Sequence, residues 1–579
     1  MSTKIIKVFL IILIVIDLTF SQDDIIFSQD SGFYGSEFLL TLSTSSELES
    51  LKIYYTTDGT NPSNSNTTKI YTEPIQIKDR SNEPNIYSNY EEDMDSPLSI
   101  SINYGYKKPE YLIEKAMVVR AVIKNGKNFG KIMSRIYFII SGDLAQFKKY
   151  TIVSLVINPE DLFDPEKGIY VTGNQFIEYK KSEKYNPEID WDPDLECNFY
   201  MKGSDWEREA SMTIFENGKI SIEQNVGVRI KGATSRDLPQ KSFNIFARKK
   251  YGNKKIKSST LFSNNKDING NAINEYDSIS LRSIPNEERS RDFFVHKIIH
   301  ETKNQATLDM KESILFLNGE LWGMYTITEK FSKDFFESHY NIPKEDIIFT
   351  KEGKMDEDTT KEITNLYNFM DLYSKKDLSN ENNYKEVCNF IDIDSLIEHY
   401  ATGIYIVMID WPNNNYGMWK SNKTGDNLYY DRKWRFMGYD FDYTMGNTYD
   451  DFGDVECYEY NMFNRVERSK RKPPTNLFIA LLKNEEFKNK FMKSYEEFIN
   501  NIMPMDKINS IIEKFKEEIT YLIAYSYERW SGYLGSSKKE TIKDAFVNYN
   551  KILKNLNIFF EKRPKYTLEN MKNYLSQLE

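Results

Sequence analysis

The sequence predicts a multidomain α+β protein in which an N-terminal β-sandwich precedes a strand-rich lobe and then a helical lobe. Three observations point to this fold class. Short β-branched and aromatic runs, separated by Gly, Asn, Pro and Asp, occupy residues 25–140. Asn-Gly pairs that favour hairpins follow, and after about residue 360 the apolar residues take a helical period. A chain of 579 residues has room for about 3–4 domains.

Residues 1–21 have the pattern of a secretory signal peptide. Lys4 and Lys7 precede the apolar run Val8–Ile16, and Ser21 offers a small residue for cleavage. The apolar run is short for a membrane span, so an uncleaved signal anchor is the weaker alternative. We therefore expect a secreted protein, extracellular or at the cell surface, with no membrane segment after cleavage.

Residues 22–145 are predicted to form the β-sandwich. Runs such as Lys52–Thr56 and Val118–Ile123 alternate with turn-forming residues, a spacing typical of small sandwiches. Residues 146–355 are predicted to form the strand-rich lobe. Asn217-Gly218 and Asn318-Gly319 each separate two β runs, which favours hairpins. Helical spacing within residues 290–303 predicts one helix in this lobe.

Residues 356–579 are predicted to form the helical lobe. Ser395 and Glu398 have the spacing of a capping box, which predicts a helix from there to about Met408. A hairpin from Leu428 to Phe436 is then expected to lead to Asp440.

The overall charge and the cysteines exclude several classes of protein. A net charge of −11 disfavours general nucleic-acid binding, because that affinity depends on phosphate neutralisation. We therefore expect no nucleic-acid partner. Cys197, Cys388 and Cys457 are too widely spaced for a zinc ribbon and allow at most one internal disulfide.

Two acidic motifs carry the clearest chemical signal. Asp410-Trp-Pro-Asn-Asn-Asn415 follows an apolar segment, and Asp440-Phe-Asp442 follows a second one. An Asp can accept a hydroxyl proton, while an Asn and a further Asp hold a divalent cation next to phosphates. Acids bordered by buried segments serve either chemistry or a structural ion pair.

The segment from Gly227 to Ile245 is a candidate phosphate-binding hairpin. Its Gly-Ala-Thr-Ser turn supplies amides and hydroxyls, including Ser235, and Arg236 and Lys241 add positive charge. The simpler interpretation is an ordinary turn followed by a solvent-facing Lys241. Glu329 comes directly after a strand, where it could orient such a lysine or simply begin a helix.

Two other kinds of site fit the sequence less well. Paired carboxylates also occur in glycosidases, but those acids normally come from separate elements with unlike surroundings. His296 and His300 have the spacing of two zinc ligands on a helix, yet no third ligand accompanies them. A polar helix face is the simpler interpretation of these histidines.

The chain resembles the CotH kinase family, named for a spore coat protein, over about residues 150–535. The resemblance rests on spaced motifs in the same order: Ser154–Tyr170, Val226–Arg236, Lys241-Ser-Phe243, Asn318–Tyr325, Asp410–Asn415 and Asp440–Asp442. The N-terminal module resembles the β-sandwich found beside chitobiase and other glycosidase domains. The motifs that carry this second likeness are Gly32-Phe-Tyr34, Tyr54–Pro62 and Val118–Val122.

The resemblance implies an atypical, secreted protein kinase that uses ATP and a divalent metal (Mg, Mn or Ca). It implies that Lys241 contacts phosphates with Arg236 and Ser235 nearby, and that Glu329 holds Lys241. It assigns the catalytic base to Asp410. The metal ligands would be Asn415 (or Asn414), Asp440 and Asp442.

Two functional hypotheses follow. The first is a kinase that transfers the ATP γ-phosphate to Ser/Thr sites on extracellular, spore or cell-surface proteins. The second is a non-catalytic surface or cell-wall protein, in which residues 22–145 bind polysaccharide and the kinase-like fold is a scaffold.

Overall fold

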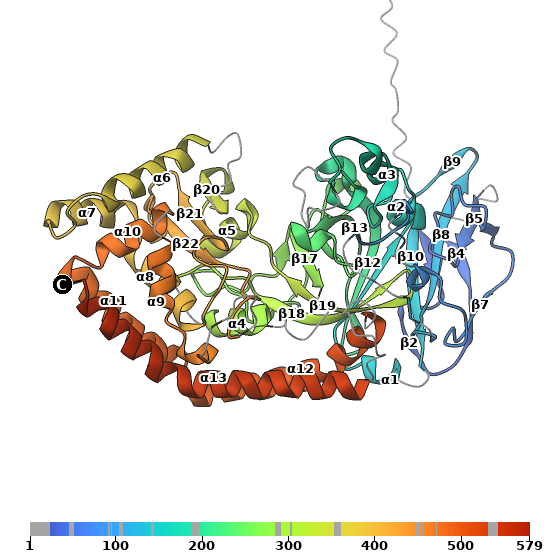
Figure 1. Cartoon of the computed structure of the whole chain (residues 1–579). Helices are drawn as coiled ribbons and strands as arrows, with labels where there is room; N and C mark the ends of the chain where they lie inside the picture. Colours follow the sequence, from blue (N-terminus) through green and yellow to red (C-terminus); the bar gives the residue numbers. More distant parts are fainter. Residues whose placement is uncertain are drawn as a thin grey trace, which may run out of the picture.

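The computed structural model contains a strand-rich N-terminal domain, a closed β-barrel and a helical region, in chain order (Figure 1). The predicted signal peptide lies outside the described residues. The structure describes residues 24–578 except for 46–50, 91–92, 94, 103–107, 110, 141–143, 187–195, 284–290, 301–303, 352–359, 447–451, 453–454, 470–471 and 531–541.

The N-terminal domain is built around one large sheet with the order β2-β10-β8-β5-β6, and β9 pairs with β8. Two small pairs, β1-β4 and β3-β7, complete it, and apolar side chains such as Leu40 and Val119 form a shared core. The strands are β1 (Ile25–Phe27), β2 (Gly32–Tyr34), β3 (Phe38–Leu40), β4 (Leu42–Thr44), β5 (Leu51–Thr56), β6 (Lys69–Ile70), β7 (Ile75–Ile77), β8 (Met117–Asn125), β9 (Asn128–Phe129) and β10 (Met133–Ile139).

The N-terminal domain packs on the barrel through a shared apolar core and through polar contacts, one of which is made by a buried carboxylate. Glu320 accepts hydrogen bonds from the Ile86 amide at 2.6 Å and from the Ser88 amide and hydroxyl at 2.8 and 2.7 Å. A second contact joins Arg135 to Glu223 at 3.0 Å. The rings of Phe138 and Phe316 meet across the same contact with centres 4.9 Å apart, so apolar packing and paired polar groups together hold the domain against the barrel.

The barrel is closed in the order β11-β12-β13-β14-β17-β19-β18. Alternating apolar side chains, among them Leu155, Phe243 and Ile279, fill its interior. The strands are β11 (Ile152–Ile157), β12 (Arg208–Glu216), β13 (Lys219–Lys231), β14 (Ser242–Phe246), β17 (Ser278–Ser283), β18 (Met310–Leu317) and β19 (Glu320–Thr328). Around it lie α1 (Leu144–Phe147), α2 (Pro159–Phe163), α3 (Gly173–Lys181), β15 (Ile256–Lys257) and β16 (Glu275–Tyr276).

Both hairpins predicted from Asn-Gly pairs are present. Asn217 and Gly218 connect β12 to β13 with φ values of 51° and 74°. Asn318 and Gly319 connect β18 to β19 with φ values of 49° and 84°. Two consecutive left-handed residues are the requirement of the type I′ turn, and Asn and Gly adopt that conformation at low cost.

The helical region includes a small sheet with the order β20-β21-β22. Helix α4 (Arg291–Ile299) is the helix predicted within residues 290–303. The other elements are α5 (Lys333–Tyr340), β20 (Ile347–Lys351), α6 (Thr360–Ser374), α7 (Glu381–Phe390), α8 (Ile393–Tyr405), β21 (Tyr416–Ser421), β22 (Arg435–Gly438), α9 (Met462–Arg468), α10 (Pro473–Leu481), α11 (Glu485–Glu497), α12 (Met505–Trp530) and α13 (Ile542–Ser576).

Two local predictions in this region were wrong in detail. Helix α8 begins at Ile393, and its cap is Asp392, whose side chain accepts a hydrogen bond from the Ser395 amide at 3.0 Å. The Asp carboxylate reaches the free amides of the first turn before Ser395 can. The strand that pairs with β22 is β21, so the tyrosine-rich run at Leu428 belongs to the connecting loop.

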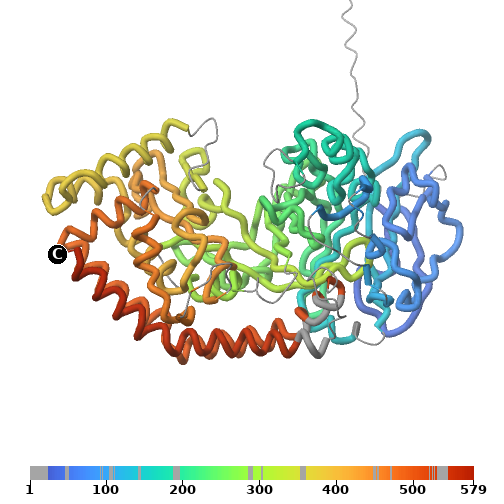
Figure 2. The backbone as a smooth tube through the Cα atoms, in the orientation of Figure 1, coloured from blue at the N-terminus to red at the C-terminus, as the bar shows by residue number. Residues whose placement is uncertain are grey.

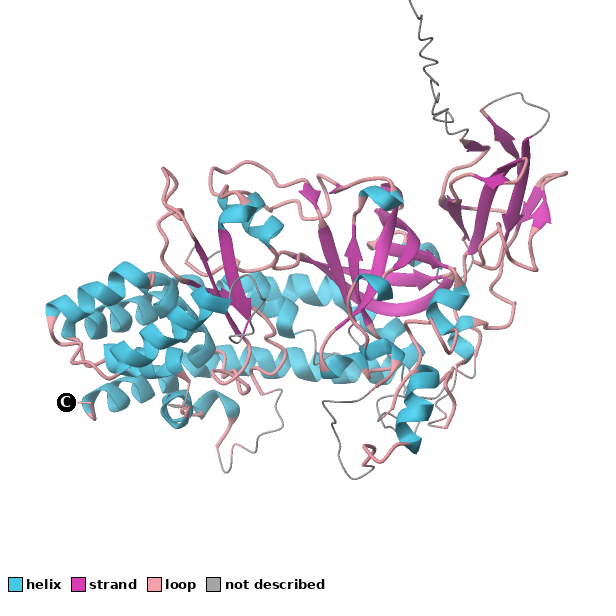
Figure 3. Cartoon of the chain, turned by 90° about the horizontal axis from the view of Figure 1, so that it is seen from above, coloured by secondary structure: helices cyan, strands magenta, loops and turns pink. Residues whose placement is uncertain are grey.

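Helices α12 and α13 run along one side of the molecule, from beneath the barrel to the helical region (Figure 2). Trp530 at the end of α12 donates a hydrogen bond from Nε1 to the Trp322 carbonyl at 2.8 Å. Seen from above, the helices gather at the end of the molecule away from the N-terminal domain (Figure 3). Within the described residues, no helix has both the length and the apolar composition needed to cross a bilayer.

Candidate active site

Asp410 follows helix α8 and is half-buried at the junction between the barrel and the helical region. Its Oδ2 accepts a hydrogen bond from Asn415 Nδ2 at 2.9 Å. Its Oδ1 is buried and has no hydrogen-bond partner. A buried carboxylate oxygen without a partner is costly, and such groups are concentrated at functional sites.

Asn415 links the two acidic motifs. Besides its bond to Asp410, its Nδ2 donates to the Asp440 carbonyl at 3.3 Å. Asn415 and Asp440 have φ values of 56° and 62°, in the left-handed region that Asn and Asp tolerate best after Gly. The structure thus brings Asp410, Asn415 and Asp440 together, as the sequence predicted, whereas Asn414 is exposed.

Asp440 and Asp442 follow strand β22 and both contact Arg282, which the sequence analysis did not single out. Arg282 Nη2 lies 2.5 Å from Asp440 Oδ1 and 3.1 Å from Asp442 Oδ2. The Asp440 side chain is 41% exposed and that of Asp442 only 6%. Asp440 is therefore the acid that an incoming ligand can reach.

Asp292 on α4 is the third acid that forms an ion pair with Arg282. Its Oδ2 lies 2.8 Å from Arg282 Nη1. Asp292 Oδ1 also accepts the Phe441 amide at 2.7 Å, so it positions the backbone between the two acids. Arg282 lies on β17, 10 residues before Asp292 but 158 and 160 residues before Asp440 and Asp442. No local pattern marks such a long-range ion cluster, so sequence reasoning missed Arg282 and Asp292.

Lys231 at the end of β13 is a second cation near these acids. Burial, followed by repulsion from Arg282 and Lys351, lowers the pKa of Lys231 to about 7, while Asp292 and Asp440 oppose the shift. Among the described residues, the Lys231 ammonium makes no hydrogen bond to a side chain or carbonyl. Lys351 lies over the Tyr439 ring, 4.4 Å from its centre. The predicted phosphate-binding hairpin therefore does supply a cation, but that cation is Lys231.

Lys241, the lysine predicted to contact phosphates, lies among backbone carbonyls and not beside Asp410 and Asp440. It is fully buried, and its Nζ donates to the carbonyls of Arg236, Ile100 and Leu238 at 2.6, 2.8 and 3.2 Å. The ammonium also lies 3.7 Å from the centre of the Phe199 ring. Burial lowers the pKa of Lys241 to about 7. Neither a phosphate contact nor the solvent-facing alternative fits this position.

The predicted ion pair between Lys241 and Glu329 is not formed. The Glu329 carboxylate accepts bonds from Asn265 Nδ2 at 2.7 Å and the Asp309 amide at 2.9 Å, and it lies 2.8 Å from His339 Nε2. Both residues have the burial expected of functional groups, but the tertiary fold places them in separate networks. Sequence spacing alone could not distinguish these arrangements.

Arg236 and Ser235 belong to the loop between β13 and β14. Arg236 donates to the carbonyls of Gly232 and Phe199 at 2.8 Å each and to that of Met201 at 3.2 Å. Its guanidinium therefore holds the loop to the neighbouring chain. Ser235 is half-buried in the same loop. The described contacts of Arg236 and Ser235 include none with Asp410, Asp440 or Asp442.

His296 on α4 and His300 just after it form no zinc-binding group with other side chains in the part of the chain that the structure describes. His296 is buried, its Nδ1 lies 2.6 Å from Thr307 Oγ1, and its Nε2 lies 3.7 Å from Asp292 Oδ1. Burial and Arg282 depress the pKa of His296 far below its ordinary value, so it is neutral. It packs edge-on against Phe441 with ring centres 5.0 Å apart, which supports the segment between the two acids rather than forming a polar helix face.

Asp410, Asp440 and Asp442 together form what we call the acid cluster. Its electrostatics suit proton acceptance near neutral pH. Burial, followed by the charges of Asp440 and Asp442, raises the pKa of Asp410 to about 7. A group with this pKa accepts a proton readily at neutral pH and releases it again. The hydrogen bond that Asn415 donates to Asp410 stabilises the charged carboxylate and so opposes part of the rise in the pKa of Asp410.

The acid cluster also fits a divalent cation, on the chemistry of its donors. Carboxylate and amide oxygens are preferred by hard cations, and Mg²⁺ is commonly held by one or two carboxylates together with substrate phosphates. The unpartnered Asp410 Oδ1 and the exposed Asp440 provide such donors. Among the described residues, no three acidic, histidine or cysteine side chains already surround a common ion position. Asp440 and Asp442 converge on Arg282 instead.

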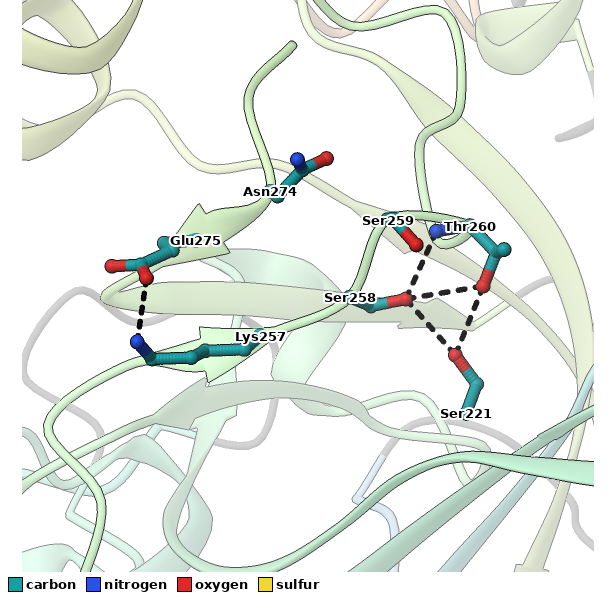
Figure 4. Close-up of a pocket in the computed structure, with 7 residues that line it drawn as sticks. All are labelled: Ser221, Lys257, Ser258, Ser259, Thr260, Asn274 and Glu275. Atoms are coloured by element: carbon teal, nitrogen blue, oxygen red, sulfur yellow. Dashed lines mark hydrogen bonds and ion pairs between the residues drawn. The ribbon is translucent and has the colours of Figure 1, made fainter.

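A separate polar hollow of about 460 Å³ lies on the barrel wall. There Ser221 Oγ lies 2.9 Å from Ser258 Oγ and 3.1 Å from Thr260 Oγ1, and Lys257 pairs with Glu275 at 2.6 Å (Figure 4). These hydroxyls satisfy one another, and no residue of the acid cluster lines the hollow. It is therefore not part of the candidate site.

Two family models match the chain. The model described as Fn3 associated matches residues 40–137, which covers most of the strand-rich N-terminal domain without pointing to chitobiase in particular. The model described as CotH kinase protein matches residues 228–567, more than half of the chain. That match contains Lys231, Arg282, Asp292 and both acidic motifs. No curated protein matches the chain. The chain belongs to the CotH kinase protein family.

Proposed function

We propose that this protein is a secreted, atypical Ser/Thr protein kinase of the CotH type, with a kinase-like pair of lobes. It transfers the ATP γ-phosphate to extracellular, spore or cell-surface proteins with the help of a divalent cation. The observation that carries the proposal is the convergence of Asp410, Asn415 and Asp440 beside two cations, with one buried oxygen of Asp410 unpartnered.

Asp410 acts as the base in this proposal. The hydroxyl proton of the substrate Ser or Thr moves to Asp410 Oδ1, and the hydroxyl oxygen bonds to the γ-phosphorus. The bond between that phosphorus and the β–γ bridging oxygen breaks, and ADP leaves with the electron pair. The pKa of about 7 at Asp410 supports this role, because the carboxylate is available at neutral pH.

Lys231 and Arg282 are the cations that would face the phosphates, in place of Lys241. Lys231 comes from the loop end of β13 and Arg282 from β17, and both influence Asp440. Positive side chains held beside developing phosphate charge stabilise the transition state. Asp292 would position Arg282 from α4 without contacting the substrate.

A divalent cation would be held by Asp440, Asp442 and Asn415, and when bound it supplies neutralisation of the phosphate charge. Asp440 is the principal candidate because its side chain is the more exposed of the two aspartates. Arg282 would have to share these carboxylates with the cation.

The proposal is tested by measuring phosphate transfer from γ-labelled ATP to a Ser/Thr-rich coat-type protein, with Mg, Mn or Ca. We expect Asp440→Asn to reduce transfer at least about 100-fold, because it removes a charge that acts on the phosphates. The matched control is Asp426→Asn, an exposed aspartate in the loop after β21, which should leave transfer unchanged.

Labelled phosphate incorporated equally by wild type and Asp440→Asn would contradict the proposal. So would the absence of transfer with all three metals together with no ATP-induced rise in melting temperature. A ligand that binds only the folded state must raise that temperature.

A second prediction separates Lys231 from Lys241. Lys241→Met should destabilise the protein by about 1–3 kcal/mol, because it leaves buried carbonyls without a donor. Lys231→Met should raise the KM for ATP while the melting temperature is kept, since its ammonium makes no bond that the fold requires. Thermal unfolding and ATP kinetics on both variants provide the measurement. A raised KM in a fully stable Lys241→Met would restore the original assignment.

The non-catalytic alternative rests on the N-terminal domain. Exposed apolar side chains lie on three of its strands, with Ile26 at 52%, Leu39 at 59% and Ile70 at 48% exposure. Such side chains are common on binding surfaces, and polysaccharide is the partner proposed for residues 22–145. Retention of the full chain on insoluble polysaccharide, with no phosphate transfer, would favour this alternative.

A further inference from the structure

A cavity of about 600 Å³ lies between strand β18 and helices α4 and α12, on the barrel side of the helical region. The proposed kinase reaction does not use it. Its walls are partly apolar and partly charged, and the residues that matter here are Phe293, Lys297, Glu312, Phe515, Glu518 and Leu522. The size is sufficient for a small organic ligand.

Glu312 is the unusual group in this cavity. It is only 8% exposed, and its Oε1 is buried without a hydrogen-bond partner. Burial raises the pKa of Glu312 to about 8, and the attraction of Lys297 does not overcome this. A carboxyl group that is buried and unpaired is costly unless a ligand completes its environment.

The charged neighbours of Glu312 are already engaged with other groups. Lys297 on α4 donates to the Met310 carbonyl at 2.9 Å and lies 3.4 Å from Asp309 Oδ1. Glu518 on α12 lies 3.8 Å from Lys514 Nζ. Burial, followed by the charge of Glu312, raises the pKa of Tyr549 on α13. Lys149, Lys311 and Lys514 also line the cavity, but among the described residues no lysine forms an ion pair with Glu312, and the ammonium of a small ligand can supply that partner.

The apolar wall suits a cation with a hydrocarbon chain. The rings of Phe293 and Phe515 stack with centres 5.3 Å apart and planes at 17°, and Leu522 extends this surface. Aromatic faces attract organic ammonium groups, and the same surface accepts aliphatic carbon. This apolar wall is a poor site for a metal ion, because hard cations require several oxygen ligands.

We propose that this cavity binds a small organic amine in its ammonium form, with the head group on Glu312 and the chain against Phe293 and Phe515. The cavity lies close to the acid cluster. Thr326 is paired in register with Glu312 on one side and with Arg282 on the other. Helix α4 presents Asp292 to Arg282 and the adjacent Phe293 to the cavity.

The test is calorimetric titration of the full chain with hexylammonium, with hexanol and hexanoate as probes of equal length. Titration above the pKa of Glu312, at about pH 9, keeps both the carboxylate and the amine charged, since an alkylamine has a pKa of about 10.4 like lysine. We expect saturable one-to-one binding of hexylammonium, at least tenfold tighter than that of hexanol, and none of hexanoate. Glu312→Gln should weaken hexylammonium binding at least tenfold.

Glu513→Gln is the matched control, because Glu513 lies on the exposed side of α12 and should leave the affinity unchanged. Equal binding of hexanol and hexylammonium would overturn the proposal, and so would equal affinity of wild type and Glu312→Gln. Absence of saturable hexylammonium binding would also overturn it. None of these results depends on phosphate transfer, so failure here is distinct from failure of the proposed kinase function.

Glu312 also predicts a pH dependence. Its folded-state pKa is raised, so its protonated form stabilises the protein at low pH, and that stability is lost as the pH rises through about 8. We expect Glu312→Gln to melt at a higher temperature than wild type above about pH 8, with the difference vanishing below about pH 4. Hexylammonium affinity in wild type should rise by up to tenfold per pH unit between about pH 6 and 8. A pH-independent wild-type affinity would contradict the role of Glu312.

Discussion

Asp410→Asn is expected to reduce kcat/KM for phosphate transfer by about 10³-fold, within the range found when a general base is removed. The substitution keeps the hydrogen bond from Asn415, because an amide oxygen replaces Asp410 Oδ2. It removes only the ability of the buried Oδ1 to accept the substrate proton. The loss should therefore fall on the chemical step.

The pH profile gives this prediction a second measurement. Below its pKa of about 7, Asp410 is protonated and cannot accept the hydroxyl proton. We expect wild-type kcat/KM to fall about tenfold per pH unit on the acid side of that value, and the residual activity of Asp410→Asn to lack this limb.

Stability separates a catalytic defect from misfolding. Because burial and two neighbouring acids raise the pKa of Asp410, its charge costs stability above about pH 7. Asp410→Asn should then be at least as stable as wild type at that pH. Asp426→Asn serves again as the control. Retention of more than a tenth of wild-type activity by a folded Asp410→Asn would remove Asp410 from the mechanism.

Arg282→Gln is expected to destabilise the protein by about 3–5 kcal/mol, the range observed when one partner of a buried ion pair is removed. Arg282 neutralises three carboxylates at once, and two of them, Asp292 and Asp442, are buried. Without the guanidinium, the folded-state pKa values of these acids rise. The instability should therefore increase as the pH rises above about 4 and diminish in acid.

Divalent cations should partly rescue this variant. With Arg282 absent, Asp440 and Asp442 are left to a cation, so millimolar Mg²⁺ should raise the melting temperature of Arg282→Gln more than that of wild type. Calorimetric melting with and without the metal measures this. An equal metal effect in both proteins would mean that the cation does not take these carboxylates.

Two controls isolate the ion cluster. Arg248→Gln also removes a cation from a buried acid, Glu207, but Arg229 and Lys250 remain beside that acid. Its cost should be well below that of Arg282→Gln. Adding Asp440→Asn to Arg282→Gln removes one unpaired charge and should restore part of the stability. If Arg248→Gln lowers the free energy of unfolding as much as Arg282→Gln does, then the contact of one arginine with Asp292, Asp440 and Asp442 does not explain the loss of stability.

The local predictions from the sequence are accurate where the structure is decided within a few residues. Asn318 and Gly319 form the expected turn because Asn and Gly both adopt the left-handed conformation at low cost. Asp410 and Asn415 meet because they are five positions apart in one loop. Helix α4 also lies within the range that its apolar spacing predicted.

Longer-range assignments failed for a common reason. Lys241 was expected to begin a strand and instead directly precedes β14, where the barrel turns its ammonium toward backbone carbonyls. Nothing near Arg282 in the sequence predicts its role, because its partners lie on α4 and beyond β22. The predicted start of α8 was wrong by only a few residues. Asp392 and Ser395 are both suitable N-cap residues, and only the path of the backbone makes Asp392 the cap.

The sequence by itself determined the mixed α/β class, the hairpin turns and the two acidic motifs, because turn conformation, periodicity and side-chain chemistry are local properties. The tertiary structure alone decided which cations face those acids. Closure of the barrel and docking of α4 bring Arg282, Lys231 and Asp292 to the acids and move Lys241 and Glu329 into other networks. Charges act through space over a few ångströms, and only the folded chain sets those separations.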